Sequence, residues 1–433
     1  MPRDIAVFGA GYIGLVTGAC FAELGHRVVV RDVVPGKVAA LEAGEVPIYE
    51  PGLAEMIARN AERLTFTLDA EVAAAGAEVV FVCVDTPPTA SGDADLSRVW
   101  AVVESLKNAD HLKALVVKST VPTGTGGKIR TYLDRVGLGH VGYVSNPEFT
   151  AEGRAVADFM APDRIVVGAF DERAAGLVAE IHEGIDGPVM RMDVLSAETV
   201  KLTANALLAT KISFTNEIAN LCELTGADVE LVMAAVGADH RLGSHFLRAG
   251  LGWGGSCFPK DSVALKQLAA NSGYPFQLLS SVIEVNDLQR RRAVSRLKEE
   301  LGGLSGKTVA LLGLTFKANT DDMREAPSTV IAARLVAEGA TVRCWDPMAR
   351  LPEGDPWTST SRHHTPLEAV EGADAAMVVT EWPELRQVQW EQARSLMRRP
   401  IVFDGRNLLD PVTMAETGFT YLSVGRTTTR PPR

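Results

Sequence analysis

The first part of the chain alternates short apolar runs, rich in β-branched residues, with amphipathic stretches of helical spacing. The apolar runs lie at residues 5–8, 27–31, 64–67, 79–84, 115–118, 142–145 and 165–167. The clearest amphipathic stretches between them lie at residues 12–24, 97–108 and 126–136. Because strands that alternate with helices usually pair in parallel, this pattern predicts a doubly wound α/β sheet.

The pattern changes near Ser196 and changes back near Lys307. Apolar residues recur at helical spacing from 197 to about 271, and the stretch from Ser196 through Cys222 predicts one unusually long helix. Strand-like runs return at 308–313, 341–345, 376–379 and 401–403, and a helical pattern follows the first of them at 326–338. We therefore expect two Rossmann-like domains joined by a long central helix and a helical middle domain.

The domain boundaries follow from these changes of pattern. We expect an N-terminal sheet domain at 1–195, a helical domain at 196–298 and a C-terminal sheet domain at 299–425. Residues 426–433, rich in Thr and Pro, are predicted to be disordered. The length agrees, because a single core rarely grows past about 250–300 residues and the chain has 433.

Composition and charge exclude several classes of protein. Lys and Arg number 43 against 54 Asp and Glu, so the net charge is −11, which argues against a general nucleic-acid binder. No apolar run is long enough for a membrane span, and residues 1–11 resemble no secretion signal. The five cysteines are widely spaced without a CxxC pair, which favours reduced thiols in the cytoplasm and no metal site.

A glycine-rich turn follows the first predicted strand. Gly9, Gly11 and Gly14 form a GxGxxG motif that opens a helix, the arrangement that binds a pyrophosphate at a helix N-terminus. Asp32 ends the second predicted strand, where an acid accepts hydrogen bonds from both ribose hydroxyls and repels a 2′-phosphate. The sequence therefore predicts a dinucleotide site that prefers NAD to NADP.

The second sheet domain has a different first turn. It reads Gly313-Leu314-Thr315-Phe316-Lys317, with a lysine where a later glycine would stand, and its second strand ends in Asp346. The turn is expected to bind a nucleotide that is not a dinucleotide.

The segment from Gly250 to Asp261, GLGWGGSCFPKD, is the most informative in the chain. Pro259 suits the start of a helix, which would place Cys257 at a helix N-terminus beside Lys260, and both features favour a thiolate. From these residues alone, a small buried cysteine in a glycine-rich turn is an equal alternative.

This segment closely resembles the cysteine motif of the UDP-glucose 6-dehydrogenase family, within the UDP-glucose/GDP-mannose dehydrogenase superfamily. Further matching motifs stand in the family order over nearly the whole chain. They are GEVPIYEPGL (44–53), VDTPP (84–88), KSTVPTGT (118–125), NPEFTAEG (146–153), KLTANALLATKISFTNEI (201–218), GLTFKANTDDMREAPS (313–328) and FDGR (403–406).

The resemblance implies a fold and an activity. It implies an NAD domain, a central helix that forms a homodimer, and a C-terminal domain that binds the nucleotide sugar. The implied reaction oxidises the C6 alcohol of a nucleotide-diphosphate glucose to a uronic acid, UDP-glucose to UDP-glucuronate, with two NAD in turn. A cysteine adds to the intermediate aldehyde, and the thiohemiacetal is then oxidised to a thioester that water hydrolyses.

The resemblance also assigns roles to catalytic residues. Cys257 is the nucleophile, Lys201 and Asn205 stabilise the oxyanion, and Glu148 activates the hydrolytic water. Thr120 and Asp261 hold a water near the sugar C6. The cofactor residues it implies, together with those of the glycine turn, are Gly9, Gly11, Tyr12, Ile13, Gly14, Asp32, Lys37, Thr86, Pro87, Thr120, Glu152, Lys260 and Arg324. The substrate residues it implies are Glu148, Phe149, Glu152, Lys201, Asn205, Arg241, Arg248, Gly250, Gly252, Trp253, Gly254, Phe316, Lys317 and Arg406.

Two departures from the family pattern leave the nucleobase open. Trp253 stands where Tyr or Phe is usual, and Asp85 replaces a small or neutral residue. A TDP-glucose 6-dehydrogenase of secondary metabolism is the main alternative, because one methyl group in an apolar pocket is worth only about 1–3 kcal/mol. A GDP-mannose or UDP-N-acetylhexosamine dehydrogenase is less expected. A non-catalytic sugar-nucleotide binder is disfavoured by the intact catalytic set.

Overall fold

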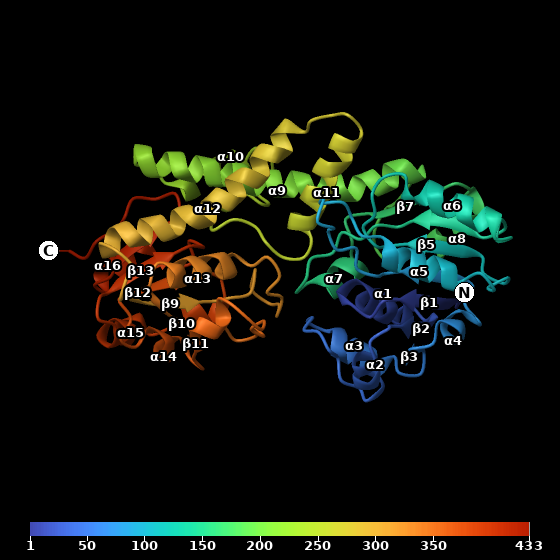
Figure 1. The fold of residues 1–433 in the computed structure, drawn as a ribbon, viewed down its shortest axis with the longest axis horizontal. Helices are drawn as coiled ribbons and strands as arrows, with labels where there is room; N and C mark the ends of the chain where they lie inside the picture. The colour runs from blue at the N-terminus through green and yellow to red at the C-terminus, as the bar shows by residue number, and fades with distance from the viewer. Residues whose placement is uncertain (433) are drawn as a thin grey trace. The chain divides into compact units, whose positions relative to one another are not determined.

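The computed structural model describes residues 1–432, and its packing divides the chain into two compact units. Unit 1 comprises Met1–Ala204 and Val263–Tyr274, and unit 2 comprises Asn205–Ser262 and the chain from Pro275 onward. Each unit contains one of the two predicted sheets (Figure 1). The predicted α/β class with two Rossmann-like sheets is therefore confirmed.

The sheet of unit 1 has eight strands in the order β3-β2-β1-β4-β5-β6-β7-β8. All neighbours pair in parallel except β6 and β7, which are antiparallel. The strands are β1 Asp4–Phe8, β2 Arg27–Arg31, β3 Leu64–Thr67, β4 Val79–Val82, β5 Ala114–Val117, β6 Gly142–Ser145, β7 Ile165–Ala169 and β8 Val189–Met192. The order reverses direction between β1 and β4, which is the switch point where doubly wound sheets bind ligands.

Helices cover both faces of this sheet. They are α1 Tyr12–Glu23, α2 Pro35–Glu42, α3 Leu53–Arg59, α4 Ala70–Ala74, α5 Ser97–Ser105, α6 Thr125–Arg135, α7 Ala155–Met160 and α8 Glu172–Ile181. Two apolar cores result, one under α1, α3, α7 and α8 and one under α5 and α6. The middle strands β4, β5 and β6 are buried along their whole length, as parallel strands between two helical layers must be.

The long helix predicted from Ser196 exists as α9, Val194–Thr225, and runs a few residues further at both ends. The other helices of the middle region are α10 Val229–Gly237, α11 Phe258–Asn271 and α12 Gln277–Leu301. Ala219, Met233 and Val294 of the middle region pack in one cluster with Val309 and Leu311 of the second sheet, and the packing divides the chain into two units. The division into three domains stays a prediction.

The sheet of unit 2 has six parallel strands in the order β11-β10-β9-β12-β13-β14. The strands are β9 Thr308–Leu312, β10 Thr341–Trp345, β11 Thr360–Arg362, β12 Ala375–Val378, β13 Ile401–Asp404 and β14 Thr420–Ser423. The helices beside them are α13 Pro327–Ala337, α14 Pro366–Val370, α15 Trp390–Leu396 and α16 Pro411–Glu416. The strand order repeats that of β1 to β6, so each unit contains the same dinucleotide-type arrangement.

The end of the described chain differs from the predicted disorder at 426–433. Thr429 forms a backbone bridge with Tyr421, and the Arg430 guanidinium pairs with Glu300 of α12 at 2.8 Å. These contacts fix residues that composition alone marked as disordered. Residue 433 lies outside the described part of the chain.

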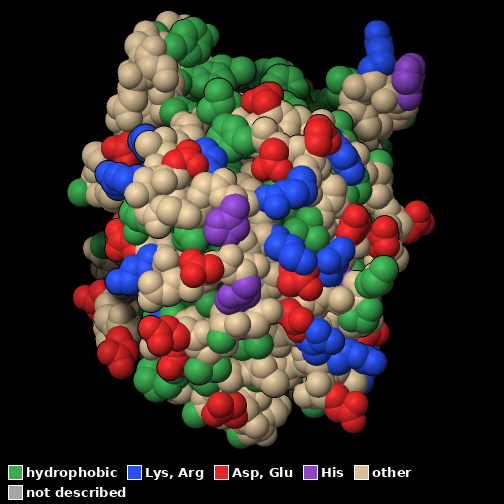
Figure 2. Space-filling view, turned by 90° about the vertical axis from the view of Figure 1, so that its right-hand side faces the viewer, with side chains coloured by type: hydrophobic (Ala, Val, Ile, Leu, Met, Phe, Trp, Pro, Cys, Tyr) green, Lys and Arg blue, Asp and Glu red, His purple; other side chains and the backbone are tan. Residues whose placement is uncertain are grey.

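Charged side chains and helix composition can be compared with the sequence-based expectations over the described residues. Figure 2 shows acidic and basic side chains interspersed over the face that it presents, without a broad area of one sign. Within residues 1–432, no helix combines the length and the apolar character needed to cross a bilayer.

Candidate active site

The glycine turn of unit 1 has the geometry of a pyrophosphate site. Gly9 has φ of +108°, and a Cβ there would lie 2.4 Å from the carbonyl oxygen of Cys83, so only glycine fits. A Cβ at Gly11 would meet nothing within 4 Å, so this position faces open space. The N-cap residue of α1 is Gly11, which has no side chain to cap the helix, and a helix N-terminus is a position where backbone amides bind phosphate. The turn therefore fits the dinucleotide that the motif predicts, with Tyr12 and Ile13 as the first residues of α1.

Asp32 lies where the sequence analysis placed it, directly after β2. Its carboxylate is buried and accepts hydrogen bonds from the Ala10 amide at 2.7 Å and from the Val34 amide at 3.0 Å. Each oxygen keeps a lone pair for a ribose hydroxyl, since a carboxylate has about four acceptor sites. Lys37, another predicted cofactor residue, follows in α2.

Two predicted threonines meet at the carboxyl end of the central strands. The Thr86 hydroxyl donates to the carbonyl oxygen of Thr120 at 2.8 Å, which ties the segment after β4 to the segment after β5. Both lie on the same sheet edge as the glycine turn, as parallel strands require. Thr86, Pro87 and Thr120 are thus brought to one edge in unit 1.

The carboxylate and the lysine of unit 1 that are predicted to be catalytic form a buried ion pair. Lys201 Nζ lies 2.7 Å from Glu148 Oε1, and each side chain is only about a twentieth exposed. The other oxygen of Glu148 accepts from the Thr150 amide at 2.7 Å and from its hydroxyl at 2.8 Å. Burial raises the pKa of the Glu148 carboxyl, but Lys201 and the Thr150 hydrogen bonds outweigh it and hold the pKa below its usual value. Glu148 is therefore ionised, as a general base must be.

A second cluster of residues that are predicted to be catalytic lies in unit 2. Asp261 is buried, and its two oxygens accept from Asn205 Nδ2 at 2.6 Å and from Lys260 Nζ at 2.5 Å. Asn205 lies four residues after Lys201 on α9, so the two side chains share one face of that helix. Lys260 also forms an ion pair with Asp261, and its predicted effect on the Cys257 thiolate stays a prediction.

Cys257 differs from the other four cysteines in its surroundings. It lies directly before α11 and is partly exposed, whereas Cys20, Cys83, Cys222 and Cys344 are buried. Burial raises the pKa of the Cys20 thiol and of the Cys83 thiol to about 12, which makes both inert. The Ser256 hydroxyl lies 3.5 Å from the Cys257 sulfur. Of the five thiols, the structure leaves Cys257 as the candidate nucleophile.

The glycine loop before Cys257 packs against every C-terminal family motif. A Cβ at Gly254 would lie 2.2 Å from the Glu325 carbonyl oxygen, and a Cβ at Gly255 would lie 2.7 Å from the Phe316 ring. Arg406 donates to the carbonyl oxygens of Gly252 and of Phe316, each at 3.4 Å. The predicted substrate residues of this loop are therefore next to Phe316 and Arg406, within unit 2.

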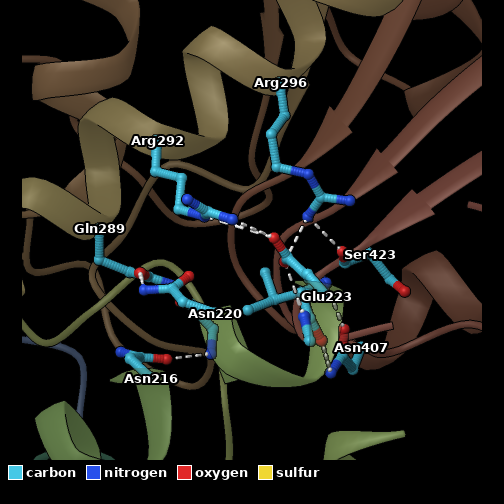
Figure 3. Close-up of polar contacts among 11 residues, drawn as sticks. Asn216, Asn220, Glu223, Gln289, Arg292, Arg296, Asn407 and Ser423 are labelled. Carbon is cyan, nitrogen blue, oxygen red and sulfur yellow. Dashed lines mark hydrogen bonds and ion pairs between the residues drawn. The ribbon is translucent and has the colours of Figure 1, made fainter. Parts of the chain in front are cut away.

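Side chains from α9 and α12 hold this loop in place, and the sequence analysis did not single them out. Asn286 accepts from the Trp253 amide at 2.7 Å and donates to the Trp253 carbonyl at 3.0 Å. Gln289 donates to the Gly250 carbonyl, and Asn216 accepts from the Gly250 amide (Figure 3).

Figure 3 also shows how α9 and α12 are fixed to the sheet of unit 2. The Glu223 carboxylate of α9 forms ion pairs with the guanidinium groups of Arg292, at 2.8 Å, and Arg296, at 2.6 Å. Arg296 also donates a hydrogen bond to the carbonyl oxygen of Ser423 at the end of β14. The Gly425 amide donates to Glu223 as well. The helices that hold the glycine loop are therefore anchored to the sheet that carries Arg406.

Two buried glutamates of unit 1 also went unpredicted. Glu198 accepts from the amides of Gly124 and Gly126, so it fixes the loop after Thr120 to α9 one turn before Lys201. Glu50 accepts from the amides of Gly153 and Ala155 and so fixes the segment that follows Glu152. Each accepts two main-chain hydrogen bonds, a role that leaves no spacing signal in the sequence.

Several predicted binding residues have partners within the protein. Arg241 binds the Asp239 carboxylate, Arg324 binds the Asp322 carboxylate, and the Lys317 ammonium lies 5.3 Å from the centre of the Phe316 ring. Arg248 is exposed, and Phe149 packs 5.7 Å from the Lys201 ammonium. Trp253 is buried, and its indole N–H donates to Ser213 at 3.0 Å. This contact explains the tryptophan structurally, and its contact with a substrate stays a prediction.

The first turn of the second sheet is closed by its own acid. Asp346 accepts from the amides of Leu314 and Thr315, from those of Met348 and Ala349, and from the Trp382 indole at 2.9 Å. Asp346 therefore holds the first turn of the second sheet from the end of β10, as Asp32 holds Ala10 from the end of β2. That this turn binds a nucleotide that is not a dinucleotide stays a prediction.

An open dinucleotide turn in one unit and a partly exposed thiol in the other are the parts of an oxidoreductase that forms a covalent adduct. Three models of one family match the chain in order: the NAD binding domain at residues 3–186, the central domain at 195–288 and the UDP binding domain at 310–411. The chain belongs to the UDP-glucose/GDP-mannose dehydrogenase family.

Similar proteins agree over almost the full length. The chain is 46% identical over 442 residues to a UDP-glucose 6-dehydrogenase of Pseudomonas aeruginosa, with 98% of this chain and 97% of that protein covered. It is 43% identical to UDP-glucose 6-dehydrogenase TuaD of Bacillus subtilis, with 99% of this chain and 94% of that protein covered. The solved UDP-glucose dehydrogenase of Pyrobaculum islandicum has a TM-score of 0.91, 39% identity, and 98% coverage of both chains.

Proposed function

We propose that the protein oxidises the C6 alcohol of UDP-glucose to the carboxylic acid, giving UDP-glucuronate, in two successive NAD-dependent steps. The observation that carries the proposal is Cys257, which is partly exposed at the head of α11 while the other four thiols are buried. An aldehyde has no easily lost hydride, whereas its adduct with a thiolate has one. The 46% and 43% identical relatives, both named UDP-glucose 6-dehydrogenases, support UDP-glucose as the substrate.

The residues of this chain act on the oxygen and on the carbonyl carbon of the substrate. NAD, when bound at the Gly9–Gly14 turn, accepts the hydride in each oxidation. Lys201 and Asn205, on one face of α9, stabilise the negative oxygen that develops at C6. The Cys257 sulfur bonds to C6 and leaves as a thiol when water cleaves the thioester. Glu148, ionised by its pairing with Lys201, takes the proton of that water.

The C-terminal unit holds the nucleotide part of the substrate in this proposal. The UDP binding domain of the family matches residues 310–411, which include Phe316, Lys317 and Arg406. These residues adjoin the glycine loop that leads to Cys257, so the nucleotide site and the thiol belong to one packed segment of unit 2. Arg241, Arg248, Gly250, Gly252 and Gly254 complete the proposed substrate set, and Glu152, Lys260 and Arg324 complete that of the cofactor.

A homodimer built on α9 belongs to the same proposal. Leu207, Phe214 and Leu221 are each more than half exposed and follow one another at intervals of seven residues, and Leu224 is 80% exposed. Such a heptad stripe matches a second helix of the same kind, and exposed apolar patches of this extent mark interaction sites. A second copy of the chain is the proposed partner, and reduced thiols favour a cytoplasmic location.

The purified protein should release two NADH for each UDP-glucuronate formed, with little free aldehyde. The measurement combines absorbance at the NADH band with chromatography of the sugar nucleotide. UDP-glucose, TDP-glucose and GDP-mannose are compared at equal concentration. One NADH for each sugar, with aldehyde accumulating, would contradict the mechanism, and faster oxidation of TDP-glucose would correct the nucleotide.

A further inference from the structure

Lys118 is a buried lysine that the proposed mechanism does not use. It follows β5 directly, and only 5% of its surface is exposed. Its ammonium lies 5.5 Å from the centre of the Phe159 ring, which is itself buried. Placing an ammonium in such surroundings costs several kcal/mol unless charged or polar partners offset the loss of water. Burial also lowers the pKa of Lys118 below its usual value.

The first partner of Lys118 is the turn that carries Glu148. Lys118 Nζ donates to Asn146 Oδ1 at 3.0 Å, and Asn146 Nδ2 donates to the Val166 carbonyl oxygen at 2.8 Å. The Asn146 amide donates to the Val117 carbonyl oxygen at 3.0 Å. Asn146 is thus bound at its amide and at both side-chain atoms, two residues before Glu148. Lys118 supplies one of the bonds that fix this turn.

The second partner is the charge of Glu148. The titratable groups that act electrostatically on Lys118, or on which it acts, are Cys20 of α1, Cys83 after β4, Glu148 after β6, His182 after α8 and Lys201 of α9. The two thiols are neutral, because burial raises their pKa values to about 12. His182 is neutral as well, because burial lowers its pKa to about 3. Glu148 is the negative group that remains in this set, and it already pairs with Lys201.

We propose that Lys118 is a positioning residue, which fixes the turn carrying Glu148 and adds a second positive charge to the Glu148–Lys201 pair. With both lysines protonated and Glu148 ionised, the three groups carry a net charge of one. This inference rests on the proposed function, in which an oxyanion develops beside Lys201. A net positive site favours that oxyanion, keeps Glu148 ionised and eases proton release from Lys201.

The test is the pH dependence of kcat for Lys118→Met and Lys118→Gln. The glutamine variant keeps a donor for Asn146 but no charge, so it separates the hydrogen bond from the charge. Loss of a nearby positive charge raises the pKa of both Glu148 and Lys201. In a plot of kcat against pH, the acidic limb reports Glu148 and the basic limb reports Lys201. Both limbs should therefore move to higher pH, by on the order of half to one pH unit, in either variant.

Two further variants show whether charge is the cause. Lys118→Arg keeps the charge, so its limbs should stay in place even if the larger side chain lowers kcat. Lys113→Met removes a half-exposed surface lysine at the other end of the same strand and should leave the profile unchanged. If the glutamine variant folds and loses rate while both limbs stay in place, the charge role is overturned.

The proposed function and this inference fail in different ways. A wild-type protein that forms no sugar acid overturns the proposed function, whatever the variants do. A wild-type protein that forms the acid, with limbs that do not move in the methionine and glutamine variants, overturns only the inference. If the methionine variant does not fold, the glutamine variant decides by itself, because it preserves the bond to Asn146.

Discussion

At the scale of the residue, the proposed reaction uses charged groups that are already paired within the protein. Glu148 and Lys201 neutralise each other in a buried contact of 2.7 Å, and Asp261 receives both Asn205 and Lys260. Paired groups of this kind hold a fixed protonation state and a fixed direction before any ligand arrives. The substrate oxygen then meets donors that need little reorganisation.

Replacing the nucleophile separates binding from chemistry. Cys257→Ala should lower acid formation by on the order of a thousandfold while both ligands still bind, because the glycine turn, Lys317 and Arg406 are untouched. The first oxidation should persist slowly, since Lys201 and Asn205 remain. Calorimetry for binding and chromatography for the acid are the measurements, and near-normal acid formation would make Cys257 a structural thiol.

Lys201→Ala is the matched comparison for that variant. Both oxidations pass through charge on the same oxygen, so each should slow by about 10²–10³-fold. The Cys257→Ala variant, in contrast, should lose the second oxidation selectively. Equal effects of the two substitutions on the first hydride transfer would show that the roles are not separable in this way.

Cofactor choice is also decided by one residue. Asp32 is buried after β2 and has acceptor capacity left for ribose hydroxyls, while its charge repels a 2′-phosphate. Asp32→Ala should therefore reduce the ratio of kcat/KM for NAD over that for NADP by about tenfold or more. Steady-state rates with each cofactor give the ratio, and equal use of both by the unaltered protein would disprove the role of Asp32.

At the scale of the element, helix α9 has two separate proposed roles along its length. Its early turns carry Lys201 and Asn205, and its later turns expose Leu207, Phe214 and Leu221 at heptad spacing. The inner face of the later turns meets α12 and the second sheet through Glu223. An exposed apolar stripe along a helix of this length is typical of a surface that binds a partner.

Charge on that stripe should separate the two copies. Phe214→Glu combined with Leu221→Glu should give a monomer at micromolar concentration, because two like charges would face each other across the symmetric contact. Sedimentation velocity measures the change, and Lys107→Glu, at an exposed position of unit 1, serves as a surface control. A wild-type protein that is monomeric and fully active at that concentration would contradict the dimer.

Elements of this kind were predictable from the sequence where the pattern was long and periodic. The glycine turn, the central strands and α9 were all expected, because buried parallel strands and extended helices leave continuous apolar signals. The edge strand β8 was missed because Val189, Met190 and Arg191 are all exposed and show no buried face. The support of the glycine loop by Asn286 and Gln289 was missed because contacts between distant segments leave no local pattern.

At the scale of the whole molecule, one buried histidine links folding of unit 1 to pH. Burial lowers the pKa of His182 to about 3, whereas an unfolded chain titrates near 6.5. Because the folded pKa is depressed, the unfolded state binds the extra proton first. Stability is therefore full above about pH 6.5 and is lost as the pH falls toward 3.

The expected size of this loss is modest and measurable. Between pH 7.5 and 5.5 the His182 contribution falls by on the order of 1 kcal/mol, which lowers the melting temperature by about 2–4 °C. His182→Phe, which keeps the ring contacts with Phe21 and Phe159, should melt with a smaller drop over the same range. His140→Phe on the surface is the control. An identical drop in all three proteins would remove His182 as the cause.

The difference between the two first turns has a consequence for the order of events in catalysis. Residues 9–14 have the GxGxxG motif and residues 313–318 do not, so the proposed function assigns both hydride transfers to the Gly9–Gly14 turn. In that proposal, this single turn would hold two NAD molecules in succession, and Cys257 would keep the half-oxidised sugar in place between them. The proposed covalent bond to Cys257 thus acts as a tether between the two oxidations. A high NADH concentration should therefore slow the second oxidation, because NADH would occupy the site that the second NAD needs.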